Sequence, residues 1–210
     1  MTKAKLGIAV FAATLALTAV ASATALAGPG WMVNGITLGA GEVRNVAEAT
    51  VVDQNFTLGA AGVTIQCEQL RVEGGFIEAL SMALAKSLIF SGCESLNAPT
   101  CTVTKTIGTV PILGTASLDA ANASAAIVTF TPETKTVFAT IKYDGASCAL
   151  LGVQPVTGKA TTLAPEGKIE KVEQRLNVNS SGELKVGSSE ATLKGGALLK
   201  LENGLSWSYL

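Results

Sequence analysis

The sequence predicts an all-β protein, an antiparallel β-sandwich or barrel with two disulfides, behind an N-terminal signal peptide. Three observations lead to this prediction. Only 15% of the residues are charged and 22 are glycine, and a chain rich in Val, Thr and Gly favours many strands joined by tight turns. Short alternating runs follow one another at the spacing typical of sandwiches and barrels. The four cysteines are an even number, as disulfide pairing requires.

The first 27 residues have the pattern of a secretory signal peptide. Lys3 and Lys5 precede an apolar run over residues 6–20, and residues 25–27 (Ala-Leu-Ala) form a small-x-small cleavage site. A retained transmembrane anchor is the alternative, because about 20 apolar residues can span a bilayer. The run is rich in Ala and Thr and lacks a basic stop-transfer flank, which favours cleavage.

Residues 28–210 are predicted to form a single β-rich domain. Removing 27 residues from 210 leaves 183, enough to bury a sizeable core. Without Lys3 and Lys5, 13 basic residues face 16 acidic ones, a formal charge of −3 without charge blocks. Nucleic acid is therefore not an expected partner. No second apolar run is long enough to span a bilayer, so membrane contact is expected only through the signal peptide.

The first half of this domain contains one clear strand signal and one ambiguous stretch. Residues 31–35 predict a strand that runs into an Asn-Gly turn, and residues 63–67 alternate, with their apolar side chains on one face. Residues 71–90 favour strands with a kink at Gly74-Gly75. Residues 78–86 contain good helix formers, so two helical turns remain the alternative to a strand there.

The second half contains the most regular alternation. Residues 136–143 predict a strand that ends at the turn Asp144-Gly145. Farther on, apolar residues alternate with polar ones in short runs, and turns are predicted over residues 179–182 and 187–189. The last two runs flank Asn203-Gly204, a dipeptide that tolerates positive φ and predicts a hairpin between them.

The cysteines predict two structural disulfides. Sequence alone allows three pairings of Cys67, Cys93, Cys101 and Cys148. We favour Cys93–Cys101, because the seven residues between them include Asn97 and Pro99 and suit a loop, and this leaves Cys67–Cys148. A zinc site would need cysteines two to four residues apart, and a redox pair would show a Cys-x-x-Cys motif. Neither pattern occurs.

The sequence predicts no catalytic, cofactor-binding or metal-binding residue. The chain has no histidine, which removes the usual general base and the commonest metal ligand. Residues 152–159 resemble a phosphate loop, but they have five residues between the glycines and Ala160 at the magnesium-binding position. A carboxylate pair could act on glycosides. The three aspartates, however, are scattered, and most glutamates alternate with lysines as on a solvated sheet face.

Two tryptophans define the alternative binding hypothesis. Trp31 and Trp207 could line a sugar-binding face, although their positions near the two ends of the domain favour core or edge roles. The sequence therefore predicts a secreted or cell-surface, non-enzymatic structural or interaction protein. The alternative is an extracellular module that binds glycans or cell wall. The sequence identifies no partner, and the candidates are a cell-wall glycan and another extracellular protein.

Several segments resemble a group of uncharacterised exported β-rich proteins from high-GC Gram-positive soil bacteria. They are residues 31–35 (Trp-Met-Val-Asn-Gly), 64–67 (Thr-Ile-Gln-Cys), the stretch from Phe90 to Val103 with its two cysteines, and the Gly- and Leu-punctuated tail from 184 to 207. The resemblance covers most of the predicted domain and implies a secreted β-rich protein. It implies no activity, cofactor or site residue.

Overall fold

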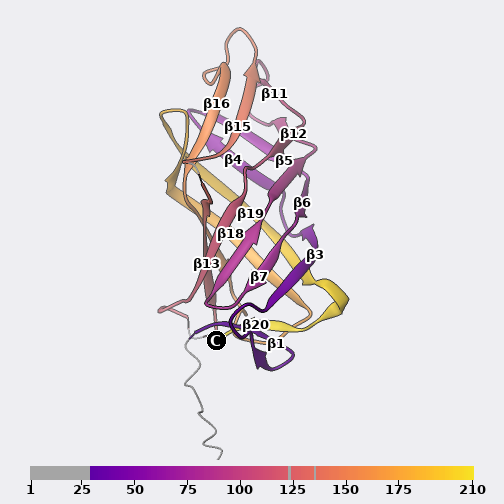
Figure 1. The fold of residues 1–210 in the computed structure, drawn as a ribbon. Coiled ribbons are helices and arrows are strands. Elements are labelled where there is room, and N and C mark those ends of the chain that lie inside the picture. The colour runs from indigo at the N-terminus through magenta and orange to yellow at the C-terminus, as the bar shows by residue number, and fades with distance from the viewer. Residues whose placement is uncertain (1–28, 123, 135) are drawn as a thin grey trace, which may run out of the picture.

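The computed structural model describes residues 29–122, 124–134 and 136–210, and the predicted signal peptide lies outside this part of the chain. The described residues form an all-β, antiparallel architecture (Figure 1), as predicted. Its main sheet contains an eight-stranded closed barrel. The strands lie in the order β19, β3, β7, β8, β13, β14, β17 and β18, and pairing of β18 with β19 closes the ring.

Several barrel strands alternate buried and more exposed side chains. Strand β17, for example, buries Ala160, Thr162 and Ala164 while its other two residues are partly exposed. The barrel strands are β3 (Val43–Val51), β7 (Phe76–Glu78), β8 (Met82–Ala85), β13 (Ile112–Leu118), β14 (Ala126–Pro132), β17 (Ala160–Ala164), β18 (Glu173–Val186) and β19 (Ser189–Leu201).

The long hairpin β18–β19 extends beyond the barrel into the part of the molecule drawn at the top of Figure 1, which we call the upper half. Its far end pairs with strands of the upper half, β16 on the β18 side and β4 on the β19 side. Beyond β4 the sheet continues to β5 and β10, and beyond β16 it continues to β15 and β11. The strands of this extension are β4 (Phe56–Ala60), β5 (Val63–Cys67), β10 (Glu94–Ser95), β11 (Thr102–Val103), β15 (Val137–Asp144) and β16 (Gly152–Gly158).

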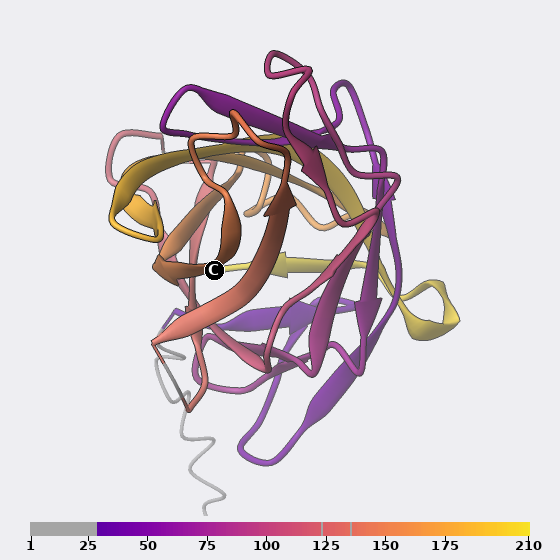
Figure 2. The same ribbon diagram turned by 90° about the horizontal axis from the view of Figure 1, so that it is seen from above.

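A separate three-stranded sheet completes the wall of the upper half. It consists of β6 (Gln69–Glu73), β9 (Ser87–Ser91) and β12 (Thr106–Gly108), in the order β12-β9-β6. A bridge between Thr109 and Ala139 joins its β12 side to β15. Seen from above, the strands of the molecule curve around a common interior (Figure 2).

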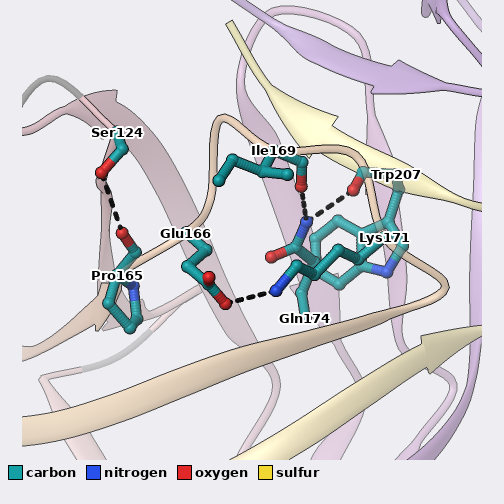
Figure 3. A network of polar contacts seen from close by, with 7 residues as sticks. All are labelled: Ser124, Pro165, Glu166, Ile169, Lys171, Gln174 and Trp207. Carbon is teal, nitrogen blue, oxygen red and sulfur yellow. Dashed lines mark hydrogen bonds and ion pairs between the residues drawn. The ribbon is translucent and has the colours of Figure 1, made fainter.

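The lower end of the barrel is closed by the first and last strands. Strand β1 (Trp31–Val33) lies between β2 (Ile36–Thr37) and β20 (Trp207–Tyr209) in a small sheet at the base (Figure 1). The buried amide of Gln174 donates hydrogen bonds to the carbonyls of Ile169 and Trp207, 2.7 and 2.6 Å away (Figure 3). The hydroxyl of Tyr209 donates to the carbonyl of Ala116 at 2.8 Å. These bonds fasten the small sheet to the barrel wall.

The structure confirms the clearest local predictions. Residues 63–67 form β5 with alternating burial, and Asn34 and Gly35 turn with positive φ directly after β1. The ambiguous stretch 78–86 is extended: β7 and β8 form a hairpin whose turn contains Leu80 and Ser81, both with positive φ. The favoured prediction of strands is therefore confirmed here, and the alternative of two helical turns is wrong. No helix in the described residues is long and apolar enough to cross a membrane.

One predicted turn and one predicted hairpin are wrong. Residues 179–182 lie inside β18, where the ladder with β19 only shifts register between Ser181 and Leu184. Residues 205–209 do not fold back on β19, because β20 pairs with β1. A short 3₁₀ turn (Glu202–Gly204) sends the chain across the base, where Trp207 becomes buried. The ladder with β19 overrides the predicted turn at residues 179–182. Asn203 and Gly204 do turn with positive φ, but the strand that follows them pairs with β1.

The preferred disulfide pairing is also wrong. The bonds join Cys67 to Cys93 and Cys101 to Cys148. Strand β10 pairs with β5 so that Glu94 lies opposite Gln66, which places Cys93 opposite Cys67. Strand β11 pairs Thr102 with Asp144, which brings Cys101 to the loop that contains Cys148. The short loop from 93 to 101 therefore connects two strands with different partners. Two structural disulfides are typical of proteins that fold in oxidising compartments.

Candidate functional site

An apolar cavity of about 160 Å³ lies where the barrel meets the upper half. Its wall includes inward-facing residues of the barrel, the long hairpin and the three-stranded sheet. The lining residues are Phe56, Thr57, Leu58, Ile65, Cys67, Leu70, Val72, Leu88, Phe90, Ile107, Thr109, Ile112, Phe130, Phe138, Ala139, Ile141, Val156, Ala160, Thr162, Leu176, Val178, Leu184, Leu193, Ala197 and Leu199.

One wall of the cavity is the inner face of β6 and β9. Their register places Leu70 opposite Phe90 and Val72 opposite Leu88, so all four side chains share one face. Phe90 also meets Phe56 of β4 edge to face, with ring centroids 5.3 Å apart. This aromatic contact joins the three-stranded sheet to the main sheet across the interior.

Small residues form part of the cavity lining. Ala139, Ala160 and Ala197 come from three different strands, and all are buried lining residues. Beside them, Gly195 has a φ of +156°, and a Cβ there would lie 2.5 Å from the Phe56 ring. Glycine thus allows Phe56 to lie against β19, while the three alanines keep the neighbouring volume open.

The cavity carries little polarity. Among the described lining residues none is charged, and the hydroxyls belong to Thr57, Thr109 and Thr162. Thr162 donates to the carbonyl of Val128 at 3.2 Å, and the Thr109 hydroxyl accepts a hydrogen bond from the amide of Leu88 at 2.9 Å. An apolar cavity of this kind stays dry, because a buried water needs two to four polar partners.

An unfilled cavity is costly for a folded protein. At about 24 cal/mol per Å³, 160 Å³ corresponds to about 4 kcal/mol of lost stability relative to a filled core. Larger side chains at the three alanines would recover part of this energy.

The three aspartates each have a different local partner. Asp53 pairs with Arg175, and Asp144 with Lys142 at 3.1 Å. Asp119 accepts a hydrogen bond from the amide of Ala121, within its own turn. No group of three or more potential metal-ligating side chains occurs in the described residues. These acidic groups form exposed pairs or turns, and none lines the cavity.

Three titratable groups outside the cavity lining have shifted pKa values. The carboxylates of Glu173 and Glu48 raise the pKa of Lys200. Glu183 accepts hydrogen bonds from Lys159 at 2.8 Å and from Thr161 at 3.1 Å, which lower the pKa of its carboxyl. Burial raises the pKa of Tyr143 to about 12. Each shift is explained by local ion pairing, hydrogen bonding or burial, and none of the three groups lines the cavity.

The two tryptophans lie at the base and not on the surface. Trp31 and Trp207 are 4% and 3% exposed, and Trp31 donates from Nε1 to the carbonyl of Met82 at 2.7 Å. The core role anticipated for these residues is therefore confirmed. Neither ring offers a face on which a sugar could stack.

A second concavity, of about 420 Å³, lies on the surface where β3 gives way to β4 along β19. Its polar lining includes Asp53, Asn177, Asn179 and Lys194, beside Gly195 and Gly196. These groups can form hydrogen bonds to a polar ligand, but the described lining contains no aromatic ring for a sugar face. It therefore supports glycan binding only through polar contacts.

Comparison of the chain with protein-family models, curated proteins and solved structures finds no match in any of the three. The resemblance to exported proteins of soil bacteria remains a prediction. Function must be inferred from the class that the fold and site define: a disulfide-linked antiparallel β-barrel with an apolar interior cavity.

The sequence indicates the disulfide cysteines but not the cavity residues. Of the four cysteines, Cys67 is also a lining residue. Ala139, Ala160 and Ala197 gave a weak signal, because each is a small residue at an inward position of a strand. That signal has meaning only once the strands that face each other are known.

Proposed function

We propose that this protein is an exported, non-enzymatic binding protein that holds a small molecule inside its barrel. The observation that carries the proposal is the apolar cavity between the barrel and the upper half. Ligand sites are typically concave, largely apolar and preformed, with few polar groups. The predicted signal peptide and the two disulfides support an extracellular setting.

The proposal narrows the broader expectation of an extracellular interaction protein. Glycan binding has weaker support, because the two tryptophans are buried at the base and the polar surface concavity lacks aromatic residues. Catalysis has less support still, because the cavity residues provide neither a titratable group nor a free nucleophile beyond threonine hydroxyls.

Equilibrium dialysis tests this proposal. The exported, oxidised protein is dialysed against a mixture of small neutral and charged organic molecules, and the retained compounds are identified by mass spectrometry after denaturation. Ala160→Leu fills the cavity, whereas Ala149→Leu makes the same change on the exposed β15–β16 loop. We expect retention by the wild type and A149L, with loss in A160L. Equal retention by all three, or no retention by any, would contradict interior binding.

A further inference from the structure

We infer that the ligand is a neutral, hydrocarbon-like molecule about the size of a single aromatic ring, without a charged head group. This inference rests on the proposed binding function and specifies the ligand class. Three properties of the cavity lead to it: the absence of charge in its described lining, its volume and the aromatic residues in its wall.

The charge of the ligand is set by the wall. A carboxylate, phosphate or ammonium group moved into an apolar interior loses its hydration and must find an opposite charge or several hydrogen bonds. The described lining residues contain no acidic or basic side chain. Of the three hydroxyls in the lining, that of Thr162 already donates to the carbonyl of Val128. Those of Thr57 and Thr109 offer at most one donor each, which is too few to replace the hydration of a charged group. A charged head group would therefore be left uncompensated.

The size of the ligand follows from the volume. The cavity of about 160 Å³ is close to an engineered apolar cavity of about 150 Å³ that stays dry and binds benzene or xenon. A single ring with one or two methyl groups, or a short branched chain, fits this space. A long acyl chain does not.

Aromatic residues favour a ring over an alkane of equal size. Phe56, Phe90, Phe130 and Phe138 all contribute to the wall, and Phe56 and Phe90 already meet edge to face. Rings prefer such offset or edge-to-face neighbours at centroid separations of about 4.5–7 Å. A planar guest can extend this arrangement into the cavity.

Sealed-cell calorimetry with toluene and benzoate tests the inference, because the two probes share a ring and differ in charge. We expect toluene to bind the wild type and A149L with an affinity at least tenfold above that of benzoate, and to lose at least about tenfold in A160L. Ala197→Leu is a second filling variant in case A160L fails to fold. Both variants are checked for cooperative unfolding before the titration.

The possible results distinguish a wrong ligand class from a wrong binding function. Benzoate binding as tight as toluene binding, and lost in the filled variants, would overturn the neutral-ligand inference while leaving interior binding intact. Toluene binding that is unchanged in both folded filling variants would place the probe outside the cavity and overturn the inference. Failure of both probes, together with the absence of any retained compound in the dialysis experiment, would overturn the inference and the proposed function.

Discussion

Trp31 and Trp207 contact each other inside the base of the barrel, with ring centroids 5.7 Å apart and ring planes inclined by 57°. They belong to β1 and β20, neighbouring strands from opposite ends of the described chain. Their surroundings differ in one respect. Trp31 Nε1 donates to the carbonyl of Met82, whereas Trp207 Nε1 has no hydrogen-bond partner among the described residues, although it is buried.

This difference predicts unequal effects of the same substitution. Trp31→Phe removes a hydrogen bond and leaves the Met82 carbonyl unpaired, whereas Trp207→Phe removes an unpaired donor. Both lose similar apolar contact. We expect W31F to be about 1–2 kcal/mol less stable than W207F. Urea unfolding at neutral pH measures the difference, and equal midpoints would show that the Met82 contact contributes nothing.

Peptide mapping without reduction tests the disulfide pattern. We expect cross-linked peptides that contain Cys67 with Cys93 and Cys101 with Cys148. The sequence separations of 26 and 47 correspond to about 3.5 and about 4 kcal/mol in the chain-entropy model. Replacing either pair with serine should destabilise the protein by about these amounts. A Cys93–Cys101 peptide would contradict the β5–β10 register.

At Gly145, the loop that contains Cys148 closely approaches the backbone of Thr100. Its φ is +120°, and a Cβ there would lie 1.7 Å from the carbonyl oxygen of Thr100. Gly152, at the other end of the same loop, has a φ of +96°, and a Cβ there would have no neighbouring atom within 4 Å. Both glycines adopt conformations that side chains disfavour, but only Gly145 is also blocked sterically.

We therefore expect Gly145→Ala to be far more damaging than Gly152→Ala. The conformational penalty of about 1–2 kcal/mol applies to both variants, and the clash with Thr100 adds to it only in G145A. Thermal unfolding and the yield of the Cys101–Cys148 bond are the measurements. Equal losses in the two variants would mean that the close approach of Thr100 is absent in solution.

Tyr143 predicts the alkaline stability profile. The side chain is 1% exposed, and burial raises its pKa to about 12, from about 10 in the unfolded chain. Between these values the unfolded state releases a proton that the folded state retains, so stability falls as pH rises. This contribution is present in full below pH 10.

The matched variant is Tyr143→Phe, which cannot ionise. From pH 10 to 11, the unfolding free energy of the wild type should fall by about 1 kcal/mol more than that of Y143F. Urea midpoints at the two pH values measure this difference. Parallel profiles would show that the tyrosine is accessible to solvent. Between pH 5 and 8 we expect little change, because the chain contains no histidine.

The fold class was predictable because a strand that buries one face shows alternating apolar and polar residues within a short stretch of sequence. The pattern of β5 is visible in Val63, Ile65 and Cys67, and all three are buried. The partner of a strand is not local in this sense. Asn203-Gly204 favours a hairpin, yet burial of Trp207 at the base and pairing of β20 with β1 decide the outcome.

The candidate site was not predictable for the same reason. Ala160 of β17 and Leu70 of β6 line one cavity although 90 residues separate them in sequence. Whether an inward alanine leaves a void depends on the side chain opposite it, which follows from strand order and register. The disulfides show the same limit: four cysteines indicate two bonds, but only the register of β10 on β5 selects Cys93 for Cys67.

A crystal structure under xenon pressure tests the central claim most directly, because xenon enters apolar cavities that stay dry. We expect a xenon atom among Ala160, Leu184 and Phe138, with the main chain unchanged. In A160L we expect no xenon at this place. An interior that remains empty of xenon because its side chains close the space, or one filled with ordered water, would contradict a preformed apolar binding site.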